Sequence, residues 1–297
     1  MSRRDLRKDV SVRGAQWAVI ALIAGALTVA CQQPSQSESP VLRWSAIPDR
    51  AVESVRAQHL PLMDVVCQAA AVQCRWVDAG TYAQVVANLG NGTTDVAFLG
   101  GVTFAQANVR YGAVPLVMRD IDTRFTSVVV VRARDPAHNL HDLQGRTFTF
   151  GDRDSTSGHV MPRHFLAATG INPEKFFSRV AYSGAHDKTL RAVSEGEVDA
   201  GVLNASIAYD ALASGGPYRG RLRMLWESPV YVDYIWAARR EIPADVRQRL
   251  IDAFLDLDNA TAGSRLALTR EAAGGFLPAY ASNFRQVADV LKRAGAL

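Results

Sequence analysis

The segment FGDRDSTSGH, residues 150–159, places three hydroxyl side chains beside a glycine in a predicted turn between a strand and a helix. Ser155, Thr156 and Ser157 can each donate a hydrogen bond, and Gly158 lets a bound group approach the backbone. The first N–H groups of a helix are unpaired and lie at its positive end, so this turn can bind a small oxyanion without lysine or arginine. The alternative is that one hydroxyl caps the helix and the others are solvated.

The surrounding sequence predicts the elements that would position this turn. Strand patterns alternate with helical patterns from 41 to 100 and again from 125 to 204. This alternation predicts two α/β units, each a mostly parallel sheet flanked by helices. The strand-rich segment 221–240 follows, and the remaining sequence has helical patterns only. If 221–240 returns to the first unit, the chain crosses twice between two lobes, and ligands of such folds bind in the crevice at the strand ends.

The first thirty residues have the pattern of an export signal. Five basic residues precede the uncharged run Trp17–Ala30, whose 14 residues are fewer than the roughly 20 needed to span a bilayer. The following LTVAC resembles the lipobox of bacterial lipoproteins, in which the cysteine, here Cys31, is lipidated and becomes the new N-terminus. Thr28 stands where that motif usually has leucine. A short anchor that is never cleaved is the alternative.

These patterns predict four segments. Residues 32–40, QQPSQSESP, are polar and lack apolar periodicity, which is typical of a flexible tether. The expected organisation is a lipoprotein signal peptide at 1–30, a tether at 31–40, a first lobe of 41–124 plus 235–297, and a second lobe of 125–234.

The charge of the chain gives no reason to expect nucleic acid as a partner. The full chain has a formal net charge of +4, but residues 1–30 contain five basic and two acidic residues. Without them, 28 basic and 27 acidic residues remain. A basic surface for nucleic acid is therefore not predicted.

Two further cysteines, Cys67 and Cys74, form a candidate disulfide in an oxidising compartment. On one straight helix they would lie about 10 Å apart along the axis, which is too far for a bond. A disulfide therefore requires the helix to end between them, as the strand-like sequence after Cys74 favours. Two buried free thiols are the alternative.

The hydroxyl turn also carries a resemblance to a known family. The segments FTFGDRDSTSGHVMP and SGAHDKTLRAVSEGEVDAG resemble the phosphate-, phosphite- and phosphonate-binding components of ABC importers, a group of type 2 periplasmic binding proteins. Similar segments at 95–107 and 125–145 extend the resemblance over most of 41–257. It implies a two-lobed fold with two hinge crossovers that binds a small oxyanion, with ABC permease and ATPase subunits as partners and no cofactor or metal. We expect an exported monomer, held on the membrane by its lipid and facing the periplasm or cell exterior.

The same resemblance implies a set of ligand-binding residues, of which Thr103 is the weakest candidate. The set is Tyr82, Thr103, Ser155, Thr156, Ser157, His186 and Asp233. Without the resemblance, His186 could be a solvated histidine before a helix, Tyr82 a surface tyrosine, and Asp233 ordinary hinge polarity.

Two departures from the family limit the ligand. Aminoethylphosphonate binders of the group have an aromatic residue where this chain has Leu99, and an acidic residue near the position of Ser206. The resemblance therefore favours phosphite, methylphosphonate or another compact tetrahedral oxyanion over an amino-bearing phosphonate.

Two other functions remain open from the sequence. The chain lacks the common nucleophile-elbow, zinc-protease and P-loop motifs, so we expect no enzyme, although a Ser157–His186 pair could act in a hydrolase. His159 and His164 could pair at a metal, but Pro162 between them disfavours regular ligand geometry. A lipoprotein that senses the same ligand for a signalling partner is the third reading.

Overall fold

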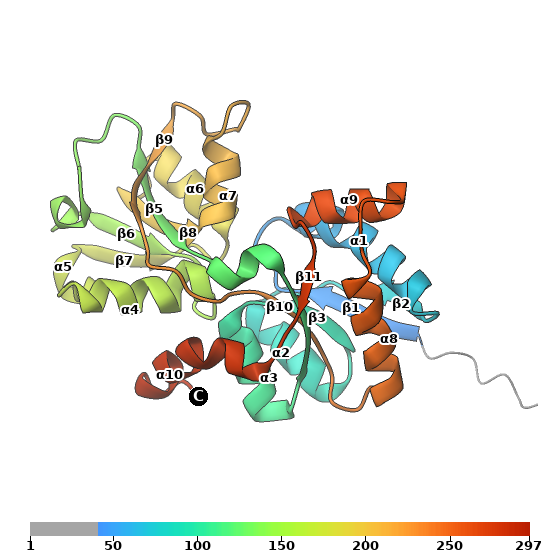
Figure 1. Cartoon of the computed structure of the whole chain (residues 1–297). Helices are drawn as coiled ribbons and strands as arrows, with labels where there is room; N and C mark the ends of the chain where they lie inside the picture. The colour runs from blue at the N-terminus through green and yellow to red at the C-terminus, as the bar shows by residue number, and fades with distance from the viewer. Residues whose placement is uncertain (1–40) are drawn as a thin grey trace, which may run out of the picture. The chain divides into compact units, whose positions relative to one another are not determined.

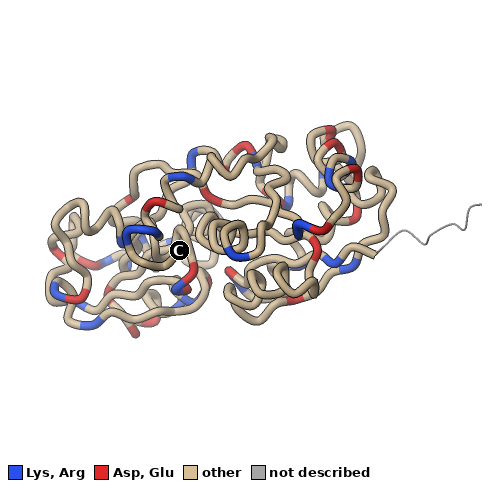
Figure 2. The backbone as a smooth tube through the Cα atoms, turned by 90° about the horizontal axis from the view of Figure 1, so that it is seen from below, with Lys and Arg blue, Asp and Glu red and all other residues tan. Residues whose placement is uncertain are grey.

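The computed structural model describes residues 41–297 (Figure 1). The predicted signal peptide, the tether and Cys31 lie outside the described residues. Within 41–297, no helix is both long and apolar enough to cross a membrane. Acidic and basic residues are interspersed along the backbone (Figure 2), in line with their nearly equal numbers outside residues 1–30.

The first lobe is built on a sheet of six strands in the order β11-β4-β10-β3-β1-β2. The strands are β1 (Val41–Ala46), β2 (Gln73–Trp76), β3 (Val96–Leu99), β4 (Val114–Arg119), β10 (Ile235–Ala238) and β11 (Phe276–Pro278). Its helices are α1 (Val52–Ala69), α2 (Tyr82–Asn91), α3 (Gly101–Tyr111), α8 (Ala244–Leu255), α9 (Ala262–Glu271) and α10 (Arg285–Arg293). Buried Trp44 and Trp236 meet in its core, with ring centroids 5.0 Å apart.

The second lobe is built on a sheet of five strands in the order β7-β6-β8-β5-β9. The strands are β5 (Ser127–Arg132), β6 (Thr147–Phe150), β7 (Arg179–Tyr182), β8 (Ala200–Asn204) and β9 (Leu222–Glu227). Its helices are α4 (Met161–Ala168), α5 (Pro173–Phe176), α6 (His186–Glu195) and α7 (Ala205–Leu212). Phe148 stacks on Phe177 in its core at 4.4 Å.

Each sheet contains antiparallel as well as parallel strands. In the first lobe, β1 pairs in parallel with β2 and β3, but β10 is antiparallel to both β3 and β4. In the second, β6 pairs in parallel with β7 and β8, whereas β5 is antiparallel to β8 and β9. β5 and β10 each enter a sheet directly from the other lobe, without the crossover helix that makes consecutive strands parallel.

The C-terminal sequence also contains a strand, although only helices were predicted there. β11 has three residues and pairs antiparallel with β4 at the edge of the sheet. So short a strand, ending in Pro278, leaves no alternating pattern to detect, and proline is tolerated at such an edge.

Two segments connect the lobes and lie against each other. One runs from Arg119 to Ser127, with a 3₁₀ turn at Asp120–Arg124, and the other from Glu227 to Ile235. The backbone N–H of Phe125 donates to the oxygen of Tyr231 at 2.8 Å, and the N–H of Tyr231 donates back at 3.0 Å.

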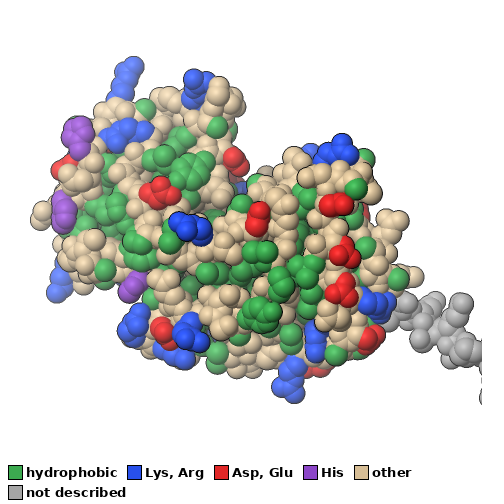
Figure 3. Space-filling model, in the orientation of Figure 1, with side chains coloured by type: hydrophobic (Ala, Val, Ile, Leu, Met, Phe, Trp, Pro, Cys, Tyr) green, Lys and Arg blue, Asp and Glu red, His purple; other side chains and the backbone are tan. Residues whose placement is uncertain are grey.

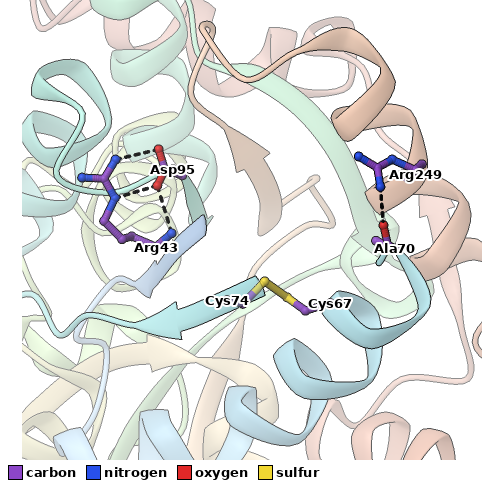
Figure 4. Close-up of a disulfide and its surroundings, with 6 residues drawn as sticks. All are labelled: Arg43, Cys67, Ala70, Cys74, Asp95 and Arg249. Carbon is purple, nitrogen blue, oxygen red and sulfur yellow. Dashed lines mark hydrogen bonds and ion pairs between the residues drawn. A yellow bond between two sulfur atoms is a disulfide. The ribbon is translucent and has the colours of Figure 1, made fainter. Parts of the chain in front are cut away.

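Cys67 and Cys74 are joined by a disulfide, with their Cα atoms 6.2 Å apart (Figure 4). α1 ends at Ala69 and β2 begins at Gln73, so the helix does end between the two cysteines. The Arg249 guanidinium donates to the carbonyl oxygen of Ala70 at 2.9 Å, which fixes the end of α1 against the C-terminal helices.

Candidate ligand-binding site

The hydroxyl turn follows β6 and opens a continuous helical segment. Ser155 is its N-cap, because its Oγ accepts a hydrogen bond from the N–H of Gly158 at 2.9 Å. A π-helical turn over Thr156–Val160 then continues into α4. Single π turns are rare and often occur at functional sites. One of the three hydroxyls therefore does cap the helix, while its proton remains available to donate.

Thr156 and Asp233 both bind the start of α3, which belongs to the other lobe from Thr156. The N–H of Val102 donates to Thr156 Oγ1 at 3.0 Å, and the N–H of Gly101 donates to Asp233 Oδ1 at 2.8 Å. Thr156 comes from the second lobe and Asp233 from a connecting segment. The two side chains thus meet at one helix N-terminus between the lobes.

Two glycines permit this close packing of polar groups. A Cβ atom on Gly100 would lie 3.0 Å from Thr156 Oγ1 and 3.4 Å from Asp233 Oδ1. One on Gly158 would lie 2.9 Å from Ser155 Oγ and 3.2 Å from the His186 ring. Larger residues at either position would push the hydroxyl turn away from its neighbours.

His186, the first residue of α6, presents one ring nitrogen as a donor. Its Nδ1 accepts a hydrogen bond from the N–H of Asn204 at 3.4 Å. The proton of the neutral ring is therefore on Nε2. Burial lowers the pKa of His186 to about 4, so the ring is neutral at pH 7. Its backbone N–H donates to the oxygen of Asp49 in the first lobe at 2.9 Å.

Four predicted site residues carry buried polar atoms that have no hydrogen-bond partner within residues 41–297. The atoms are Tyr82 Oη, Ser157 Oγ, His186 Nε2 and Asp233 Oδ2. Each of these residues is at most 2% exposed. The other such atoms in the described chain are on Trp44, Ser45, Thr94, Ser194 and Trp236. An unpaired buried polar atom costs about 1–3 kcal/mol, so a set drawn from four separate elements indicates groups that a ligand completes.

The protonation of these groups suits an anion. Burial, with Asp49 nearby, raises the pKa of Tyr82 well above its usual value, so the phenol remains a donor. Burial also raises the pKa of Asp233 to about 7, although the N–H groups of Gly101 and Tyr234 oppose the shift. The Asp233 Oδ2 atom therefore shares a proton readily near neutral pH.

The hydroxyl of Thr103 is already engaged as a donor. It is buried on α3, and its Oγ1 donates to the carbonyl oxygen of Gly100 at 3.0 Å. Thr103 therefore lies beside the bond from Val102 to Thr156, but its hydroxyl proton is used at the start of its own helix.

Two residues that were not predicted from the sequence, Asn204 and Tyr234, support the site next to His186. Asn204 Nδ2 donates to Tyr234 Oη at 2.9 Å, which joins the end of β8 to a connecting segment. Tyr234 has a φ of +46°, a left-handed conformation that is uncommon for a non-glycine residue and often found at functional positions. Asn204 ends a buried strand at its carboxyl end, which was the available signal; Tyr234 carried none.

Leu99 and Ser206, the two positions at which the sequence departs from aminoethylphosphonate binders, lie in different surroundings. Leu99 is fully buried at the end of β3, beside Ile235. Ser206 lines a polar cavity of about 70 Å³ together with Asn204 and Tyr234. The molecular surface is hollowed here between α7 on one side and α1 and α9 on the other (Figure 3).

Comparisons with known proteins identify the family of the chain. Residues 45–284 match the family described as ABC transporter, phosphonate, periplasmic substrate-binding protein. The chain is 26% identical to a probable ABC transporter phosphite binding protein, PhnD1, of Prochlorococcus marinus, over 86% of this chain and 91% of that one. It is 25% identical to the phosphate-import protein PhnD of Mycolicibacterium smegmatis, over 92% and 94% of the two chains.

The solved structure of the Prochlorococcus PhnD1 in complex with methylphosphonate superimposes with a TM-score of 0.82 at 25% identity. The similarity covers 86% of this chain and 99% of that one. The predicted two-lobed α/β fold is thereby confirmed. Because the family match spans most of the sequence, the chain belongs to the periplasmic substrate-binding proteins of phosphonate ABC transporters.

Proposed function

We propose that this chain captures a small phosphorus oxyanion, such as phosphite or methylphosphonate, between its two lobes and delivers it to an ABC permease with its ATPase. The observation that carries the proposal is the set of unpartnered, buried atoms on Tyr82, Ser157, His186 and Asp233. The methylphosphonate bound to the Prochlorococcus relative supports a ligand of this chemistry.

The donors and the acceptor fit a tetrahedral anion that keeps one proton. Tyr82, Ser157 and the Nε2–H of His186 donate to the ligand oxygens, and the hydroxyl protons of Ser155 and Thr156 add to them. Asp233 Oδ2 shares a proton with one oxygen of the ligand. Sulfate has no proton of its own at neutral pH, so only the proton that Asp233 carries could be shared with it, and we expect it to bind more weakly.

Replacing Tyr82 with phenylalanine is expected to weaken methylphosphonate binding about 10- to 100-fold, since a hydrogen bond to a charged group contributes roughly 1.5–3 kcal/mol. The same change should not lower the stability of the ligand-free protein, because the hydroxyl it removes is buried without a partner. Calorimetric titration and thermal unfolding measure the two effects.

Tyr231 supplies the matched control for stability. It is also buried, but its hydroxyl is 2.6 Å from Ser127 Oγ, so Tyr231→Phe should lower the free energy of unfolding by about 1 kcal/mol. If Tyr82→Phe destabilises the free protein as Tyr231→Phe does and leaves methylphosphonate affinity unchanged, the Tyr82 hydroxyl serves folding and the proposed site is wrong.

We further propose that the segments 119–127 and 227–235 act as a hinge between lobes bounded at 124/125 and 234/235. A ligand that touches both lobes favours the arrangement in which they are close. Saturating methylphosphonate is therefore expected to reduce the radius of gyration measured by small-angle X-ray scattering. An unchanged radius at saturation would contradict hinge closure.

Cys31 is proposed as the lipid attachment site that holds the exported protein on the membrane. Cys31→Ser is expected to yield protein without the acyl mass, unprocessed or released, whose binding domain has unchanged affinity. Mass spectrometry of the membrane fraction tests this. A mature N-terminus far from Cys31 in the unaltered protein would rule the assignment out.

The proposed function includes no chemical step. Ser157 Oγ and His186 Nε2 do not hydrogen-bond to each other, and Nδ1 of His186 faces a backbone N–H where a hydrolase would need an orienting acceptor. Turnover of a chromogenic phosphoester by the purified protein, lost in Ser157→Ala, would refute this part of the proposal.

A further inference from the structure

Hydrogen bonds between the lobes extend beyond the residues proposed to hold the ligand. The backbone N–H of Ala51, in the first lobe, donates to Oδ2 of Asp187 in the second lobe at 3.1 Å. On α3, Nε2 of Gln106 donates to Oδ1 of Asp154 in the second lobe at 3.0 Å. Asp154 directly precedes the hydroxyl turn and Asp187 directly follows His186. The two bonds therefore lie on either side of the proposed site.

The first bond completes a helix of one lobe with a side chain of the other. Ala51 is the N-cap residue of α1, and the structure shows no side-chain cap there. The positive end of this 18-residue helix attracts a carboxylate, and Asp187 provides one from the second lobe. This contact exists only while the lobes are together.

The second bond is formed at a more buried place. Gln106 lies on α3, after Val102 and Thr103, and is 7% exposed. Its amide reaches Asp154, whose own backbone N–H donates to Asp152 Oδ1 at 2.8 Å within the loop before the hydroxyl turn. If the lobes opened, this amide and this carboxylate would lose each other and hydrogen-bond to water instead.

We propose that these two contacts, Ala51–Asp187 and Gln106–Asp154, form a closure latch that sets how tightly every ligand is held without contacting any of them. The inference rests on the proposed function, because it assumes that ligand binds to the closed arrangement. A ligand that requires the closed state binds with an apparent dissociation constant that is inversely proportional to the closed fraction. Weakening the latch lowers that fraction by the same factor for each ligand.

This mechanism has a signature that a residue in the ligand site would lack. Phosphite and methylphosphonate should lose affinity by the same factor, so their ratio of dissociation constants stays constant. The dissociation rate should rise while the association rate changes little, as is usual when contacts made after encounter are lost. A residue that touches the ligand would change the ratio.

Two substitutions remove one latch bond each. Ala51→Pro deletes the N–H donor, and the φ of −52° at this position is one that proline adopts. Gln106→Leu deletes the amide with little change in size. Each is expected to weaken both phosphite and methylphosphonate about three- to tenfold, and the double variant by the product of the two factors.

Gln248→Leu is the matched control for Gln106→Leu, because it removes an amide hydrogen bond to Asp252 within α8, 2.7 Å long, and should leave both affinities unchanged. If the wild type binds both anions and the double variant binds them equally well, or with an altered ratio, the latch is wrong and the proposed function stands. A wild type that binds neither anion contradicts the proposed function itself. Should Ala51→Pro fail to fold, an unchanged affinity in Gln106→Leu alone refutes the latch.

Discussion

Changing Ser155, Thr156 and Ser157 together to alanine is expected to weaken methylphosphonate binding by about three powers of ten or more. Each hydroxyl that bonds an anion contributes roughly 1.5–3 kcal/mol, and every tenfold in affinity is about 1.4 kcal/mol. The loss should be smaller than the sum of the three, because the backbone N–H groups of the turn remain. Calorimetric titration of the wild type and the triple variant measures it.

The triple variant should still fold. It loses the Ser155 cap on Gly158 and the bond from Val102 to Thr156, which together cost about 2 kcal/mol. Domains of this kind are stable by roughly 5–15 kcal/mol. Ser155→Ala alone is the control, since it removes the same cap and leaves two hydroxyls. If a folded triple variant binds as well as wild type, the turn is only a capped loop.

Methylphosphonate affinity is expected to fall about tenfold for each pH unit above 7, and Asp233→Asn should abolish most of that fall. Burial raises the pKa of Asp233 to about 7 in the free protein, against about 3.8 in an unfolded chain. The bound complex keeps one proton between Oδ2 and a ligand oxygen, so it holds more protons than the free components above pH 7. By linkage, affinity then decreases as the pH rises.

Asparagine removes the need for that proton without disturbing the orientation of the side chain. The backbone N–H groups of Gly101 and Tyr234 both donate to Oδ1, which keeps the oxygen of an amide on that side and turns its NH₂ group toward the ligand. Titration of the ligand itself is common to both proteins. Parallel pH profiles for wild type and Asp233→Asn would show that Asp233 does not share the ligand proton.

The stability of the ligand-free protein should depend on pH below 7, where Asp233 and His186 change their charge. Because Asp233 binds its proton more tightly when folded, its contribution to stability decreases as pH rises from about 3.8 to 7. His186 behaves in the reverse sense: its pKa is lowered to about 4, so the unfolded chain binds the extra proton and stability increases with pH from about 4 to 6.5. The two effects oppose each other over this range.

Much of the fold, and the hydroxyl turn as a candidate site, could be predicted from contiguous stretches of sequence. The hydroxyl turn, the glycine after it and the strand before it are contiguous, so their order alone indicated an anion site at a helix start. The division into two α/β lobes followed from alternation of strand and helix patterns. The end of α1 before Cys74 followed from the length of a helix that a disulfide cannot span.

What sequence could not show depends on contacts between distant segments. That Ser155 is the capping hydroxyl, and Ser157 the one left free, is decided by the π turn and by the start of α3. The donor nitrogen of His186 is decided by Asn204, 18 residues away. The mixed sheets arise because β5 and β10 arrive from the opposite lobe, a direction that no pattern within a strand records.

The most direct measurement is a crystal structure of the protein with methylphosphonate. We predict one ligand between the lobes, with its oxygens about 2.5–3.2 Å from Tyr82 Oη, Ser157 Oγ, His186 Nε2 and Asp233 Oδ2. The Ala51–Asp187 and Gln106–Asp154 bonds should be present. A ligand bound elsewhere, or bound with these four atoms facing water, would contradict the account.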